Sequence, residues 1–235
     1  TRETGKTLME ATAIDVGAGA MVLAWIGQNA TRYLSAERVP TPQVILKHKR
    51  HTIVYRPLGV VGVISAWNYP WFVGGNVFVP ALLAGNSVLY KPSEFASLTG
   101  LEIERLLHES GVPKDAFIAL IGGGEVGAAL LKQPVDGVFF TGSAATGARI
   151  AAAVGQRMVR LQLELGGKDP TYVADDAEPK AAAESLADGA MYNTGQSCCS
   201  VERIYVHERI HDEFVRHFVA TVAGFRIGDP LADGS

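Results

Sequence analysis

The sequence is poor in cysteine and has no block of like charges. Its only two cysteines among 235 residues are the neighbours Cys198 and Cys199, so they cannot form a disulfide framework. With no signal peptide recognisable either, we expect a reducing, cytoplasmic setting. Lys and Arg number 21 against 24 Asp and Glu, a net charge of −3, which favours neither a nucleic-acid partner nor an anionic membrane.

Charge is missing altogether between Arg56 and Lys91, a stretch long enough to span a bilayer. Three prolines, three asparagines and five glycines divide this stretch into short pieces. Strands that are buried on both faces also give uninterrupted apolar runs. We therefore predict a buried strand–helix–strand here, and no membrane partner.

Short apolar runs alternate with helical patterns through the middle of the chain. The expected strands are residues 60–65, 87–90, 117–121, 138–140 and 159–163, and the expected helices are 77–83, 100–109, 125–132 and 145–153. This alternation predicts an α/β fold with a doubly wound, mainly parallel sheet and helices on both faces. In such sheets ligands bind beyond the carboxyl ends of the strands.

The two ends of the chain follow other patterns. We expect a helix over residues 4–34, followed by two short strands at 44–48 and 51–56 that form a hairpin. After Gly167 the pattern resets, with strands at 171–173 and 203–206 and helices at 179–192 and 210–223. These last elements predict the start of a second α/β unit.

Residues 122–127 fit the glycine pattern G-x-G-x-x-G between a strand and a helix. That context is typical of a dinucleotide site, where glycines let the backbone approach a pyrophosphate. About twenty residues further on, however, where an acid should hold the ribose, lies Phe140-Thr141-Gly142-Ser143. Nucleotide contact and an ordinary glycine-rich turn both remain open on this motif alone.

A zinc-protease pattern, H-E-x-x-H, occurs at His207-Glu208-Arg209-Ile210-His211, with His217 in the place of a third ligand. Both histidines must share one helix face, but the strand pattern that precedes His207 places it before the helix. On a continuing helix His211 and His217 are about 240° apart. We therefore keep a metalloprotease only as a remote alternative and expect no metal site.

Cys198 follows the short glycine loop Gly195-Gln196-Ser197. A free cysteine is often a small buried hydrophobe, and that alternative stays open on this segment alone. Polar residues at strand ends favour a functional interpretation: Asn68, Lys91 with Glu94, and Ser143 each follow a different predicted strand. All of them lie on the edge where a doubly wound sheet binds its ligand.

Five motifs in order carry a resemblance through essentially the whole chain. They are Ala66-Trp67-Asn68-Tyr69-Pro70, Lys91-Pro92-Ser93-Glu94, Phe140-Thr141-Gly142-Ser143 through Gly147, Glu164-Leu165-Gly166-Gly167-Lys168, and Gly195-Gln196-Ser197-Cys198. Together they resemble the motifs of the aldehyde dehydrogenase superfamily, non-acylating type. The resemblance implies a Rossmann-like sheet and oxidation of a small-molecule aldehyde to a carboxylic acid.

The resemblance also implies catalytic roles. Cys198 would attack the aldehyde as a thiolate and pass through a thiohemiacetal and a thioester. The side-chain amide of Asn68, with the backbone N–H of Cys198, would hold the oxyanion. Glu164 would activate the water that hydrolyses the thioester, and its presence favours a free acid as product over acyl transfer.

For the cofactor the resemblance implies NAD, with NADP less favoured. Lys91 and Glu94 would bind the adenosine ribose, because a carboxylate there accepts from the 2′-hydroxyl and repels a 2′-phosphate. The implied cofactor-binding set is Trp67, Lys91, Glu94, Gly124, Gly142, Ser143, Gly147 and Leu165.

The implied domains are an NAD-binding domain of residues 1–39 and 59–166, an oligomerisation hairpin of 40–58, and the N-terminal part of a catalytic domain over 167–235. The family's later Glu-x-Phe-Gly-Pro motif is missing, so we expect a fragment with little or no turnover of its own. A non-catalytic NAD-binding fragment is therefore the second hypothesis. The full-length protein is expected to be a homodimer or homotetramer.

Overall fold

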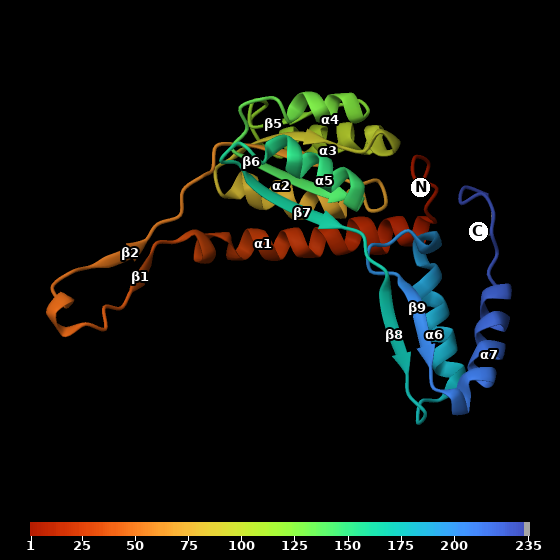
Figure 1. Ribbon diagram of the computed structural model, residues 1–235. Helices are drawn as coiled ribbons and strands as arrows, with labels where there is room; N and C mark the ends of the chain where they lie inside the picture. Colours follow the sequence, from red (N-terminus) through yellow and green to blue (C-terminus); the bar gives the residue numbers. More distant parts are fainter. Residues whose placement is uncertain (233–235) are drawn as a thin grey trace.

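The structure is a computed structural model, and it describes residues 1–232. Its centre is a five-stranded sheet in the order β5-β4-β3-β6-β7, in which every pair of neighbours is parallel (Figure 1). The strands are β3 (Val60–Ile64), β4 (Ser87–Lys91), β5 (Phe117–Ala119), β6 (Gly137–Gly142) and β7 (Arg160–Leu165). The predicted parallel sheet is confirmed, with five strands in the predicted places.

Helices cover both faces of this sheet. They are α2 (Phe72–Leu83), α3 (Ser97–Glu109), α4 (Gly124–Leu130) and α5 (Ala144–Val154). One apolar cluster joins α2 and α3 to the sheet through Phe78, Tyr90 and Ile103, and a second joins α4 and α5 through Leu130 and Ile150. The segment between Arg56 and Lys91 therefore folds as a strand, a helix and a strand.

Helix α2 begins at Phe72, earlier than the predicted Val77. The prediction began later because Gly74 and Gly75 have low helix propensity. A Cβ at position 74 would lie 2.9 Å from the Tyr90 hydroxyl oxygen, so the missing side chain lets this turn of the helix press against the sheet. Close packing therefore outweighs the cost of glycine in this helix.

The N-terminal helix is long and apolar. A π-helical segment, Glu10–Gly17, leads into α1 (Ala18–Leu34), and the combined helix Leu8–Leu34 is long and apolar enough to cross a membrane by length and composition alone. It lies along α2: a Cβ at Gly19 would lie 2.9 Å from the Trp71 ring, and one at Gly75 would lie 3.6 Å from Leu23. Core helices of water-soluble proteins pass the same length test.

The predicted hairpin is wrong in one of its two strands. Residues 44–46 form a 3-10 turn, and β2 (His51–Ile53) instead pairs antiparallel with β1 (Glu37–Val39), upstream of the predicted boundary at residue 40. The two-residue turn that the prediction needed, Lys49-Arg50, has no Gly or Asn to adopt positive φ. The chain therefore turns through a wider loop, and the ribbon extends away from the body (Figure 1).

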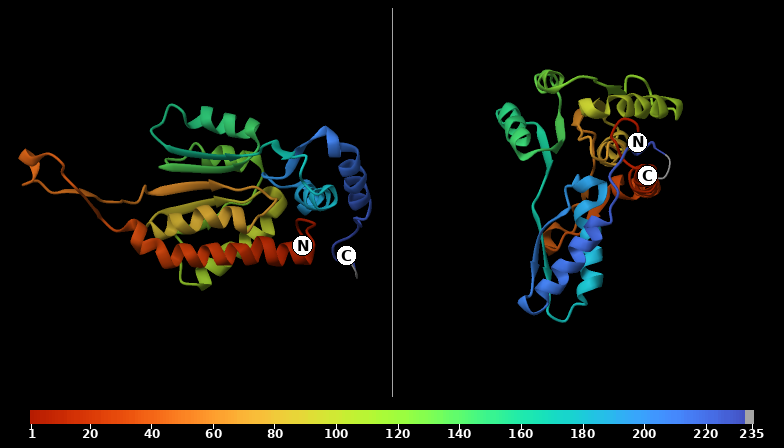
Figure 2. Two further views of the ribbon diagram at one scale, coloured as in Figure 1. Left: turned by 90° about the horizontal axis from the view of Figure 1, so that it is seen from below. Right: turned by 90° about the vertical axis from the view of Figure 1, so that its right-hand side faces the viewer.

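A second, smaller α/β unit follows Gly167, as predicted. It contains β8 (Asp169–Val173), α6 (Pro179–Met191), β9 (Val201–Val206) and α7 (His211–Ala223), with β8 and β9 parallel. Phe214 of α7 packs on Val173 and Ala183 in a third apolar cluster. This unit lies at the opposite end of the molecule from the β1–β2 ribbon (Figure 2). Residues 233–235 of the predicted 167–235 segment lie outside the described residues.

Candidate active site

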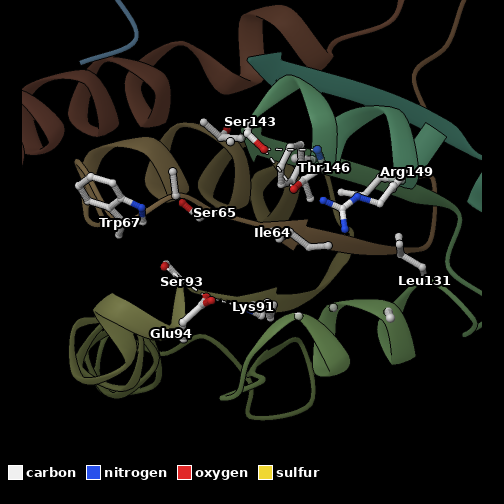
Figure 3. Close-up of a pocket in the computed structure, with 18 of the residues that line it drawn as sticks. Ile64, Ser65, Trp67, Lys91, Ser93, Glu94, Leu131, Ser143, Thr146 and Arg149 are labelled. Atoms are coloured by element: carbon white, nitrogen blue, oxygen red, sulfur yellow. Dashed lines mark hydrogen bonds and ion pairs between the residues drawn. The ribbon is translucent and has the colours of Figure 1, made fainter. Parts of the chain in front are cut away.

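A cavity of about 750 Å³ opens at the carboxyl edge of the sheet. The chain passes from β3 outward to β5 and then returns to β6 on the other side of β3, so the connections diverge between β3 and β6. The cavity is lined by the segments that follow β3, β4 and β6 and by the facing sides of α4 and α5 (Figure 3). This is where doubly wound sheets bind their ligands, and the volume is ordinary for a small-molecule site.

Most of the predicted cofactor-binding residues line this cavity: Trp67, Lys91, Glu94, Gly124, Gly142 and Ser143. Gly147 and Leu165 do not line the cavity, but they are packed against each other. A Cβ on Gly147 would lie 2.8 Å from Leu165 Cδ2, so the glycine lets α5 lie close to β7. Their close packing positions α5, whose other face lines the cavity.

Lys91 and Glu94 form a fixed pair at one side of the cavity (Figure 3). Lys91 is buried; its Nζ donates to the Pro92 carbonyl at 3.0 Å and lies 3.4 Å from Glu94 Oε2. The Glu94 backbone N–H, aided by the charge of Lys91, holds the pKa of the Glu94 carboxyl below its usual value. Glu94 is therefore ionised near neutral pH and can accept from a hydroxyl group.

Sequence reasoning missed three polar lining residues: Lys132, two residues after α4, and Thr146 and Arg149 on α5. Arg149 reaches into the cavity, and its Nε donates to Ala145 O at 3.4 Å (Figure 3). For two of them the spacing was a usable signal: Thr146 is three residues after Ser143 and Arg149 three after Thr146, and residues three apart are neighbours on a helix surface.

Cys198 lies on the loop between α6 and β9 and is exposed. Burial of part of the side chain and then the neighbouring Cys199 raise the pKa of the Cys198 thiol. The alternative of a thiol sealed in the core therefore does not apply in this chain.

Asn68 ties the β3 loop to the cysteine loop. Its Nδ2 donates a 3.0 Å hydrogen bond to the backbone carbonyl of Gln196, two residues before Cys198. Nδ2 carries a second hydrogen, and Oδ1 is buried with no hydrogen-bond partner among the described residues.

Asn193 reinforces this junction and was also missed from the sequence. It is buried with a left-handed backbone (φ 50), and its Nδ2 donates to the carbonyls of Asn68 and Gln196 at 3.1 and 3.0 Å. Its N–H donates to Glu10 Oε1 at 2.7 Å. Asparagine is enriched in this backbone conformation. Its partners Glu10 and Asn68 are far away in the sequence, so no local sequence pattern could have predicted these contacts.

Glu164 lies near the end of β7, opposite Thr141 of β6, and is exposed. Its Oε1 accepts from Gln162 Nε2 at 3.0 Å. Three residues later, a Cβ on Gly167 would lie 3.5 Å from the carbonyl oxygen of Cys198. Three residues span at most about 11 Å, so the fold brings the Glu164 backbone into the neighbourhood of the cysteine loop.

The histidine pattern does not form a single helical face. His207 caps a 3-10 turn, Glu208–Ile210, and α7 begins only at His211. His211 lies beside Asp212 and His217 beside Glu213. Within residues 1–232 no group of three His, Cys, Asp or Glu side chains is placed to hold a metal ion.

The chain is similar to known proteins both in sequence and in structure. The sequence profile of the aldehyde dehydrogenase family matches residues 1–235. A betaine aldehyde dehydrogenase of Rhizobium johnstonii is 36% identical over all of this chain and 47% of its own length. The peroxisomal aminoaldehyde dehydrogenase 2 of Pisum sativum is 38% identical over 98% of this chain and 46% of its own.

Solved structures give the same result. A γ-glutamyl-γ-aminobutyraldehyde dehydrogenase from Burkholderia cenocepacia superposes with a TM-score of 0.91 at 35% identity, over 97% of this chain and 46% of that one. An indole-3-acetaldehyde dehydrogenase mutant of P. syringae, in complex with NAD+ and IAA, gives 0.89 at 33% over 97% and 46%. The chain thus spans about half the length of the relatives it matches, and it belongs to the aldehyde dehydrogenase family.

Proposed function

We propose that these residues form the cofactor domain and nucleophile loop of an enzyme that oxidises an aldehyde to a carboxylic acid with NAD. The observation that carries this proposal is the hydrogen bond from Asn68 to Gln196, which holds the exposed Cys198 loop at the cavity edge of the sheet. Glu164 enters the same neighbourhood through Gly167.

Each residue has a distinct task in this reaction. The Cys198 thiol loses its proton to solvent, and the thiolate attacks the carbonyl carbon to give a thiohemiacetal. Loss of a hydride from that carbon, for which a bound nicotinamide would be the acceptor, leaves a thioester. The second N–H of Asn68 Nδ2, with the backbone N–H of Cys198, stabilises the oxyanion. Glu164 takes a proton from the water that cleaves the thioester.

The cavity residues fit a dinucleotide. A glycine-bearing face of α4, at Gly124 and Gly127, offers close backbone approach, and Ser143 stands at the N-terminus of α5. Lys91 and Glu94 would hold the adenosine ribose, and the ionised Glu94 supports NAD over NADP. When bound, the nicotinamide supplies a hydride acceptor.

The whole protein is proposed to be a homodimer or homotetramer in a reducing cytoplasm. The β1–β2 ribbon supports association, because Val44 and Ile45 at its tip are 77% and 81% exposed. An extended ribbon with apolar side chains and free strand edges gains from covering by another chain.

Two measurements separate an enzyme from a non-catalytic NAD-binding fragment. We expect Cys198→Ser in the full-length protein to abolish aldehyde-dependent NADH production while leaving the NAD dissociation constant unchanged. Lys91→Ala should instead weaken NAD binding. Retained oxidation in Cys198→Ser would refute the catalytic proposal, and unchanged NAD affinity in Lys91→Ala would refute the cofactor site.

A further inference from the structure

A second thiol, Cys199, lies in a cluster of hydroxyl groups next to the proposed nucleophile. Its Sγ is 3.3 Å from the Tyr192 hydroxyl and 3.3 Å from Ser197 Oγ. Tyr192 in turn donates to Ser197 Oγ. A hydroxyl donates one hydrogen at a time, so Tyr192 donating to Ser197 and Ser197 donating to sulfur form a chain that ends on Cys199.

The hydroxyl of Tyr69 faces the same group. Tyr69 is 7% exposed, and within the described residues its buried hydroxyl has no hydrogen-bond partner. Burial raises the pKa of the Tyr69 hydroxyl, the neighbouring Ser197 and Tyr192 lower it, and the charge of Cys199 raises it. Tyr69 thus adds a third, buried hydroxyl beside those of Ser197 and Tyr192.

The two adjacent thiols therefore stand in different surroundings. The hydroxyl of Ser197 and, behind it, that of Tyr192 lower the pKa of the Cys199 thiol, whereas burial and the neighbouring Cys199 raise the pKa of the Cys198 thiol. Both side chains are exposed, so access does not separate them. The thiolate is the nucleophilic form of cysteine, and hydroxyl groups at 3.3 Å stabilise it on Cys199.

We propose that Cys199, held by the hydroxyls of Ser197 and Tyr192, is the site at which soft electrophiles, α,β-unsaturated aldehydes in particular, modify this chain before they modify Cys198. The sulfur lone pair bonds to the β-carbon, the carbon–carbon π bond breaks, and the α-carbon takes a proton from water. The thiol proton has already passed to solvent, and the aldehyde group is left intact. This reaction does not depend on the proposed dehydrogenase activity.

Iodoacetamide and acrolein are suitable probes on the 235-residue chain. Limited labelling near neutral pH, followed by peptide fragmentation, should place the adducts on Cys199 rather than on Cys198. With iodoacetamide, the Cys198→Ala chain should react about fivefold or more faster than the Cys199→Ala chain. Labelling of the unaltered chain keeps the test valid if either variant folds poorly.

Removing a hydroxyl tests the cause. In the Cys198→Ala background, Tyr192→Phe should move the midpoint of the iodoacetamide pH profile upward, toward that of an ordinary thiol. Tyr205→Phe, on the exposed face of β9, should leave the midpoint unchanged. Adducts that form first on Cys198, or a midpoint that ignores Tyr192→Phe, would overturn the proposal.

Discussion

The side-chain amide of Asn68 and the backbone carbonyl of Gln196 meet at 3.0 Å, although 128 positions separate the two residues in the sequence. This bond joins the loop after β3, which also lines the cavity, to the loop that carries both cysteines. It makes the cavity and the thiols parts of one region, and the predictions below start from that connection.

Asn68→Ala should reduce kcat in the full-length protein roughly 100- to 1,000-fold, because it removes both the proposed oxyanion donor and the link to Gln196. Steady-state kinetics with one aldehyde measures this effect. Asn76→Ala, on α2, serves as the matched control. A rise in KM with kcat unchanged would show that the amide does not act specifically on the transition state.

Glu94→Gln should narrow the difference in affinity between NAD and NADP. The neutral amide neither repels a 2′-phosphate nor accepts as strongly from a 2′-hydroxyl, so we expect NAD binding to weaken roughly tenfold and NADP binding to improve. Titration calorimetry with both nucleotides measures the change. Glu102→Gln, on the solvent side of α3 beside Arg105, should alter neither constant.

The 235-residue chain should bind NAD but produce no NADH steadily with aliphatic or aromatic aldehydes. The physical reason is that Cys198 and Glu164 are both exposed in this chain, so water surrounds the reacting groups. An absorbance assay for NADH with a range of aldehydes checks this expectation. Sustained turnover would contradict it.

Asn86→Ala should destabilise the fold by about 2–3 kcal/mol. The buried Asn86 Oδ1 accepts from the N–H groups of Leu58 and Gly59 at 2.6 and 3.1 Å, and its Nδ2 donates to Ala81 O at 2.9 Å. Chemical denaturation of the variant measures the loss. The exposed Asn29, with one bond to its own helix, should tolerate alanine within about 0.5 kcal/mol.

Asp15 is buried beside Lys6, whose Nζ lies 3.9 Å from Asp15 Oδ2, and Asp15 Oδ1 accepts from the N–H of Phe72 at 2.9 Å. Asp15→Ala should destabilise the chain by about 1–3 kcal/mol, because the N–H of Phe72 loses its acceptor. Asp15→Asn keeps an acceptor oxygen and removes a buried charge, so it should cost less in chemical denaturation. Equal losses in Asp15→Ala and Asp15→Asn would show that the hydrogen bond to Phe72 does not contribute.

The same pair has a pH signature. Burial raises the pKa of the Asp15 carboxyl despite the N–H of Phe72 and the charge of Lys6. Since the folded value lies above the unfolded one, protonated Asp15 favours the fold, and this contribution is lost as pH rises through the folded pKa. Denaturation curves at a series of acidic pH values should show the free energy of unfolding falling by this contribution as pH rises in the parent chain, but not in Asp15→Asn.

The sequence by itself determined the layered fold and the order of the site motifs. Strand and helix periods are local properties, so the alternation from Val60 onward located all five strands of the sheet. The positions of Lys91, Glu94 and Ser143 at strand ends were enough to bring them to one cavity, because parallel strands end on one edge.

Only the tertiary structure decided which residues that are distant in the sequence contact one another. Which strand pairs with His51–Ile53, why Asn193 takes a left-handed backbone, and that Arg149 reaches the cavity all depend on groups distant in the sequence. The hydroxyl chain from Tyr192 through Ser197 to Cys199 likewise needs a folded loop. Hydrogen bonds and close packing are short-ranged in space, so no period or spacing along the chain encodes them.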